Sequence, residues 1–123
     1  MADFPKKMRL LTKADFNQVF NKSVKVSNSL FLILIHKNSK SHARLGLVIS
    51  KKVDKRAVVR NRIKRLVRES FRNYEFSQNC DFVVLARAKA KEHKNQALLA
   101  NLNNLWSQAE NKIKQISQSR KKK

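Results

Sequence analysis

The alternation of apolar and polar positions predicts a small set of strands along this chain. The unbroken apolar run at residues 30–35 (LFLILI) is too short for a typical helix and is rich in β-forming residues, and residues 45–50 (LGLVIS) and 81–86 (DFVVLA) are mostly apolar as well. Such runs are typical of strands that are buried on both faces. Residues 23–27 (SVKVS) alternate as an edge strand does. Gly46, the only glycine, suggests a bulge or a close backbone approach in its strand.

Apolar residues at helical spacing predict three helices, at about residues 13–20, 57–74 and 96–117. Thr12 with Asp15 three positions later resembles a capping box at the start of the first helix. The middle helix has one apolar stripe, made of Val59, Ile63, Leu66, Val67, Phe71 and Tyr74. The last helix has another, made of Leu98, Leu102, Leu105, Ala109, Ile113 and Ile116, with Trp106 beside it. We expect both stripes to pack on the sheet.

The order of these elements is helix, two or three strands, helix, strand, helix, which is typical of an α+β fold. We predict a two-layer sandwich with the helices packed on one sheet. The length of 123 residues suits one domain. We therefore expect a single domain over residues 1–123, with an extended N-terminal arm (1–11) and a frayed basic tail (118–123).

The polar side of the middle helix carries nearly uniform positive charge. Arg60, Asn61, Lys64, Arg65, Arg68 and Arg72 occupy the arc opposite the apolar stripe, and Arg62 lies at its edge. A merely solvated face usually mixes signs, because like charges one turn apart repel. Residues 51–72 contain ten basic and two acidic residues, a net charge of +8. A phosphate-binding surface relieves this repulsion and releases counterions. Arginine adds bidentate phosphate contacts, and Asn61 can pair with a base edge or a 2′-hydroxyl.

The charge of the whole chain points to the same kind of partner. Lys and Arg number 29 against 8 Asp and Glu, a formal net charge of +21. Such a protein is drawn to polyanions, and nucleic acid fits better than an anionic membrane surface. No apolar run approaches the ~18 residues of a membrane span, and the N-terminal residues lack a secretory signal pattern. We expect a cytoplasmic protein without a membrane partner.

Residues suited to catalysis or metal binding are scattered. The acidic residues form no D-x-D or E-x-x-H pattern, and the three histidines lie in polar turns and linkers. Cys80, the only cysteine, has no metal-ligand spacing around it. A self-sufficient nuclease needs clustered carboxylates or an acid–base pair. We therefore expect no catalytic residue and no metal-binding residue in this chain.

The residues 50–69, SKKVDKRAVVRNRIKRLVRE, resemble the signature of the protein component of bacterial ribonuclease P. The resemblance covers most of the chain and depends on residue order as well as composition. It includes FPK near the start, RLLT followed by DFNQVF (15–20), RLGLVISKK (44–52), DFVVLA (81–86) and LNNLW (102–106).

This resemblance implies a fold, an activity and partners. The family order is α-β-β-β-α-β-α, with an uncommon left-handed β-α-β crossover. The ribonuclease P holoenzyme hydrolyses one phosphodiester to remove the 5′ leader of precursor tRNA. Catalysis is expected from the RNA subunit, with Mg²⁺ ions that are held mainly by that RNA. The protein would bind ribonuclease P RNA and precursor tRNA, and no obligate protein partner is implied.

The resemblance also assigns site residues. Arg60, Asn61, Arg62, Lys64, Arg65 and Arg68 match the RNA-contacting helix, and Lys51 and Lys52 match the basic strand end. Phe16 and Phe20 match aromatic residues of the cleft that receives the leader, although their spacing also suits the core. Leu34 stands where some relatives are expected to have an aromatic residue.

Two rival functions share the charge of this chain. One is a general structured-RNA-binding or ribosome-associated protein with no enzymatic role, and the other is a DNA-binding protein with its helix in the major groove. Preference for structured RNA over duplex DNA would separate the second from the others.

Overall fold

The computed structural model describes residues 9, 12–38, 40 and 42–121 as an α+β fold. The elements are α1 (Lys13–Lys22), β1 (Val24–Ser27), β2 (Phe31–Lys37), β3 (Arg44–Val48), α2 (Ala57–Asn73), β4 (Cys80–Ala86), the 3₁₀ helix η2 (Ala88–Glu92) and α3 (Asn95–Lys121). This order confirms the predicted α-β-β-β-α-β-α arrangement, with η2 as an addition. Of the predicted N-terminal arm, all residues but Arg9 lie outside the described residues.

The four strands form one mixed sheet in the order β1-β2-β4-β3. The pairs β1–β2 and β2–β4 are antiparallel, whereas β3 and β4 are parallel and are joined through α2. This is the β-α-β unit that the resemblance implied, and its handedness stays a prediction. Gly46 lies opposite Val83 in an uninterrupted ladder, so it marks no bulge. Arg9 adds an isolated bridge to Leu45 at the outer edge of β3.

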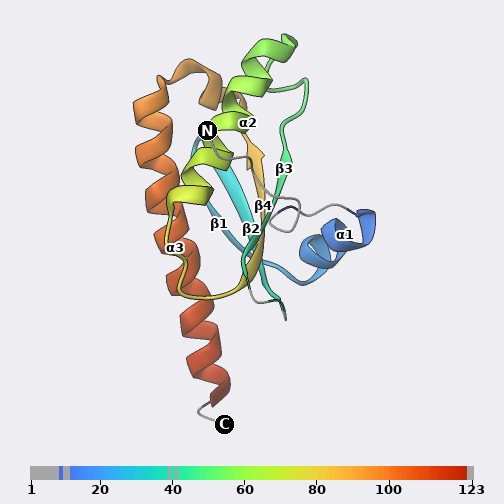
Figure 1. Cartoon of the computed structure of the whole chain (residues 1–123), viewed down its shortest axis with the longest axis vertical. Coiled ribbons are helices and arrows are strands. Elements are labelled where there is room, and N and C mark those ends of the chain that lie inside the picture. Colours follow the sequence, from blue (N-terminus) through green and yellow to red (C-terminus); the bar gives the residue numbers. More distant parts are fainter. Residues whose placement is uncertain (1–8, 10–11, 39, 41, 122–123) are drawn as a thin grey trace.

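Helices α2 and α3 cover one face of the sheet (Figure 1). The side chains at alternate positions of β2, such as Ile33 and Ile35, point into this core and are fully buried. The buried residues of the two predicted helical stripes are Ile63, Leu66, Val67, Phe71, Leu98, Leu102, Leu105, Ala109 and Ile113. Both stripes are therefore confirmed as core-facing, while the side chain of Ile116 lies outside the described residues.

Helix α1 packs on the opposite face of the sheet (Figure 1). Val19 of α1 is fully buried against Leu34 of β2 and Val83 of β4. The expected single helical layer therefore holds for α2 and α3, and α1 adds cover on the other side. The cause is the continuous apolar run of β2, which leaves apolar side chains on both faces.

Helix α3 continues to Lys121, four residues beyond its predicted end. No glycine or proline follows residue 46 in this sequence, so nothing in the chain stops the helix at 117. Residues 118–121 of the predicted frayed tail are helical here, and 122–123 lie outside the described residues. No helix in the described part of the chain is both long enough and apolar enough to cross a membrane.

Trp106 fixes the contact between α3 and α2. Its ring is fully buried and meets Phe71 and Phe82 edge-on, with ring centroids 5.8 and 5.6 Å away. Its indole Nε1 donates a hydrogen bond of 2.8 Å to Ser70 Oγ, and Ser70 is itself buried. The one polar atom of this aromatic cluster is thereby satisfied.

We expect Ser70→Ala to lower the free energy of unfolding by about 1–3 kcal/mol, because it leaves the buried Trp106 Nε1 without an acceptor. Urea unfolding followed by tryptophan fluorescence measures the change. Ser29→Ala, at an exposed position, is the control and should change stability by less than about 0.5 kcal/mol. Equal stabilities of the two variants would show that the indole finds another partner.

Candidate nucleic-acid interface

The loop between β3 and α2 is organised around one buried carboxylate. Asp54 is only 9% exposed, and its Oδ1 accepts hydrogen bonds from Arg56 N at 2.8 Å and Arg56 Nε at 3.1 Å. Its Oδ2 accepts from Arg56 Nη2 at 3.0 Å. Lys51 and Lys52, at the start of this loop, are exposed. The loop therefore folds around its single acid and leaves both lysines free to face a partner.

These hydrogen bonds shift the ionisation of both groups. Donation from Arg56 lowers the pKa of Asp54 to about 2, and the nearby charge of Lys91 acts in the same direction. The hydrogen bond from Asp54 likewise raises the pKa of Arg56. The carboxylate is therefore charged throughout the neutral and mildly acidic range.

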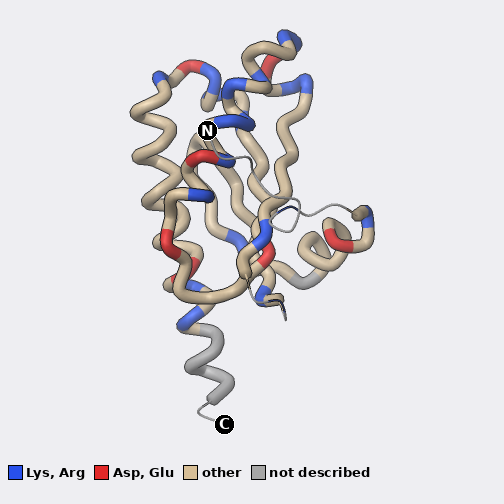
Figure 2. The backbone as a smooth tube through the Cα atoms, in the orientation of Figure 1, with Lys and Arg blue, Asp and Glu red and all other residues tan. Residues whose placement is uncertain are grey.

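The cationic face of α2 is presented to solvent next to this loop (Figure 2). Asn61, Arg65 and Arg68 are exposed, whereas Arg60, Arg62 and Lys64 are partly buried. The sequence-predicted RNA-binding residues thus lie on one helix face and on the loop that leads into it. We define the cationic surface as Lys51, Lys52, Arg60, Asn61, Arg62, Lys64, Arg65 and Arg68.

Arg60 holds the loop against the first turn of α2. Its Nη1 donates to the backbone oxygens of Asp54 at 2.9 Å and Lys55 at 2.8 Å. Helix α2 has no side-chain cap, because its N-cap residue is Arg56. The guanidinium of Arg60 therefore fixes the backbone entry into a helix that lacks the usual capping group.

A second basic segment, residues 87–94, was not among the binding residues predicted from the sequence. Residues 88–92 form η2, and Ala90 at its centre is fully buried. The exposed cations around it are Arg87, Lys89, Lys91 and Lys94. Figure 2 shows this segment at the same end of the molecule as the β3–α2 loop. Its dense basic spacing was the only signal in the sequence.

The two predicted aromatic residues lie on α1, on the sheet face away from α2. Phe16 is partly buried and packs against the cluster of Val19, Leu34 and Val83, whereas Phe20 is 44% exposed. Leu32, Val48 and Leu85 pack partly buried against the same cluster. Phe16 thus contributes to the core, and Phe20 leaves much of its ring available to a partner.

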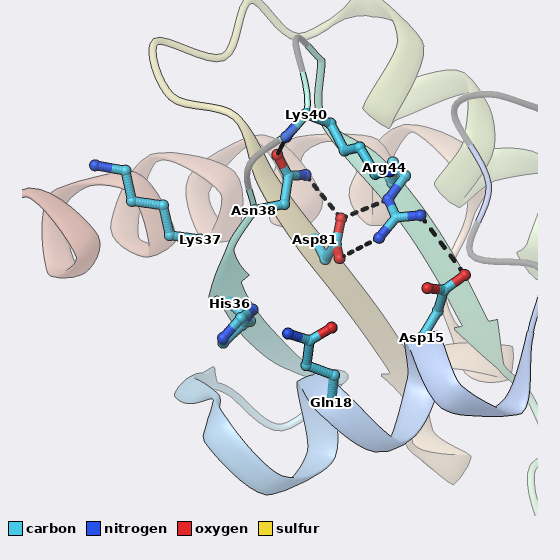
Figure 3. Close-up of a pocket in the computed structure, with 8 residues that line it drawn as sticks. All are labelled: Asp15, Gln18, His36, Lys37, Asn38, Lys40, Arg44 and Asp81. Carbon is cyan, nitrogen blue, oxygen red and sulfur yellow. Dashed lines mark hydrogen bonds and ion pairs between the residues drawn. The ribbon is translucent and has the colours of Figure 1, made fainter.

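A polar pocket of about 520 Å³ lies beside α1, where the sheet face becomes charged (Figure 3). Strand register aligns His36, Asp81 and Arg44 in one row across β2, β4 and β3. Arg44 donates through Nε and Nη2 to the two oxygens of Asp81, at 2.8 and 2.7 Å, and Asp15 lies 3.6 Å from its Nη1. Burial of Asp81 at 2% exposure and these bonds make the pair a structural clasp between β3 and β4.

We expect the β3–α2 loop to lose stability in acid. The folded pKa of Asp54, about 2, lies below its ordinary value, so its contribution is full above pH about 4 and is lost as the pH falls towards 2. At low salt, the free energies of unfolding of the unmodified protein and of Asp54→Asn should therefore become more alike as the pH falls through this range. Glu75→Gln, at an exposed position after α2, is the control. A difference between protein and Asp54→Asn that is independent of pH would contradict this assignment.

Comparison with known proteins supplies the family of this chain. The family model described as Ribonuclease P matches residues 4–110. A ribonuclease P protein component of Marinomonas sp. (strain MWYL1) is 46% identical over 121 residues, covering 97% of this chain and 92% of that protein. The ribonuclease P protein component of Aliivibrio fischeri is 46% identical over 105 residues, covering 85% of this chain and 90% of that protein.

Solved structures agree in fold as well as in sequence. The Staphylococcus aureus RNase P protein superposes with a TM-score of 0.78 at 33% identity, over 83% of this chain and 94% of that chain. The Thermotoga maritima RNase P protein gives 0.74 at 32% identity, over 81% and 96%. The chain therefore belongs to the ribonuclease P protein family and shares that family's role in RNA binding and tRNA 5′ processing.

Proposed function

We propose that this chain is the non-catalytic subunit of a cytoplasmic ribonuclease P, and that it binds both the RNA subunit and the 5′ leader of precursor tRNA. The RNA subunit hydrolyses the phosphodiester with Mg²⁺. The observation that carries this proposal is the cationic surface, which displays many positive charges with few internal partners. The protein would raise substrate affinity and reduce the magnesium concentration that the RNA needs.

The side chains with the most freedom to bind RNA are the exposed members of the cationic surface. Within the described part of the chain, Lys51, Lys52, Arg65 and Arg68 donate no side-chain hydrogen bond to the protein itself. Asn61, exposed between them on the helix, offers an amide donor and acceptor. The lysines and arginines can bind phosphates with release of counterions. The amide of Asn61 can pair with a sugar or a base edge.

The leader would lie on the α1 side of the sheet. Phe20 offers an exposed ring, and Phe16 with Leu32 and Leu85 extends an apolar surface beside it. Unpaired bases stack on such surfaces without strong sequence preference, which suits a protein that must accept many leaders. Leu34 is 3% exposed beneath α1, so at that position packing replaces stacking.

We assign the Mg²⁺ ions mainly to the RNA subunit. Among the residues that the structure describes, no three His, Cys, Asp or Glu side chains converge to hold a metal ion. Asp15 and Asp81 both pair with Arg44. A cation placed there would compete with the guanidinium. In this proposal the protein organises the RNA, and the RNA supplies the metal site.

We expect Arg65→Ala to weaken binding to ribonuclease P RNA and to lower the slope of log K against log salt by about one unit, because one phosphate contact is lost. Filter binding over a salt series measures both quantities. Lys25→Ala is the matched control, since it removes one exposed charge from β1, outside the cationic surface. Equal slopes for Arg65→Ala and the unmodified protein would exclude Arg65 as a phosphate ligand.

We expect Phe20→Ala to reduce the preference for leader-bearing over mature tRNA by about 1–3 kcal/mol, the usual value of one base–aromatic stack. Competition binding to the assembled holoenzyme measures this preference. Val58→Ala, which removes a 74% exposed side chain from α2, is the control for loss of apolar surface. If Phe20→Ala weakened both tRNA forms equally, Phe20 would not contact the leader.

A further inference from the structure

Arg62 differs from the other arginines of the cationic surface because its guanidinium bonds to a part of the chain that is distant in the sequence. Its Nη1 donates to Asn95 Oδ1 at 2.7 Å and to His93 O at 3.4 Å, and its Nη2 donates to Lys91 O at 3.3 Å. The three acceptors span the last turn of η2 to the first residue of α3. They are 29 to 33 positions away in the sequence. One side chain therefore joins α2 to a distant junction.

Arg62 supplies a cationic donor to this junction. The last carbonyl groups of a helix lack partners within it and carry the negative end of its dipole. Lys91 O and His93 O are such groups at the end of η2, and no side-chain donor from within the segment itself bonds to them among the described residues. The planar fork of an arginine can reach several oxygens at once, which the single ammonium of a lysine cannot do.

A second contact fastens the same segment from the loop side. Lys91 Nζ lies 3.9 Å from Asp54 Oδ2, and Asp54 is the buried carboxylate around which the β3–α2 loop folds. Below, Ala90 is fully buried in the core. The segment from η2 to α3 is thus held by α2, by the loop and by the core, while Lys91 and Lys94 remain exposed.

We propose that Arg62 is a positioning residue, which latches the η2–α3 junction to α2 and thereby adds Lys91 and Lys94 to the surface that binds RNA phosphates. Arg62 acts through this junction instead of through a phosphate contact of its own. The part of this inference that concerns RNA rests on the proposed function, whereas the latch itself does not.

Hydrogen exchange on the RNA-free protein tests the latch. In Arg62→Lys, which keeps the charge but loses the fork, amides of residues 91–98 should exchange faster than in the unmodified protein. Asn95→Ala, which removes the shortest acceptor without changing charge, should have the same effect to a smaller degree. Arg65→Lys is the matched control and should change nothing in this segment. Unaltered exchange in both Arg62→Lys and Asn95→Ala would overturn the proposal.

Binding of the same variants to ribonuclease P RNA tests the positioning role. Arg62→Lys and Asn95→Ala should each weaken binding about three- to tenfold, the equivalent of one net hydrogen bond. The effect of Lys94→Ala should largely disappear in the Arg62→Ala background, because that lysine is already displaced. Faster exchange with unchanged RNA affinity, or fully additive effects of Arg62→Ala and Lys94→Ala, would overturn the positioning role.

Failure of the proposed function gives a different result. If the unmodified protein did not bind ribonuclease P RNA in a salt-dependent manner, the proposed function would fail while the exchange data still decided the latch.

Discussion

Burial of the apolar side of α2 holds its cationic side together. Ile63 and Val67 are fully buried and Phe71 is 1% exposed, and burying each such side chain contributes about 1.5–3 kcal/mol. Repulsion between like charges one turn apart costs only a few tenths of a kcal/mol per pair. The free energy gained by burying the apolar side therefore exceeds the cost of the repulsion by a wide margin. The helix can keep a charge pattern that would disfavour it in isolation. The repulsion between these side chains remains in the free protein. A bound polyanion would relieve it, because its phosphates neutralise the positive charges.

Three acidic residues are buried inside the protein, whereas the cationic side of α2 faces outward. Asp54, Asp81 and Glu110 are each less than a tenth exposed, and each accepts several hydrogen bonds from the chain itself. Asp54 organises the loop before α2, and Asp81 clasps β3 to β4. Glu110 of α3 accepts from Ser77 N, Ser77 Oγ and Gln78 N, which orders the turn before β4. Because these carboxylates bond to groups of the chain itself, they stabilise the fold, while the exposed lysines and arginines remain the outermost charges.

Local patterns in the sequence were sufficient for the α-helices, the strands and the two sides of α2, but not for η2. The apolar run of β2 predicted burial on both faces, but the short and weakly patterned α1 could not show which face it would cover. Strand order and the parallel β3–β4 pair depend on contacts between distant residues, so no local period reports them. The same holds for Arg62. Its charge and its place in the family signature put Arg62 with the RNA-binding residues. Its three acceptors lie at residues 91–95, at a distance in the sequence that no local pattern reports.

The proposed function requires that the cationic surface binds an RNA catalyst and assists its reaction. The most direct measurement is single-turnover cleavage of a precursor tRNA by a bacterial ribonuclease P RNA at low magnesium, with and without this protein. We predict faster cleavage at the correct 5′ site when the protein is present, and no cleavage by the protein alone. Tight binding to the RNA without any change in the cleavage rate would contradict the account and would favour a general RNA-binding protein.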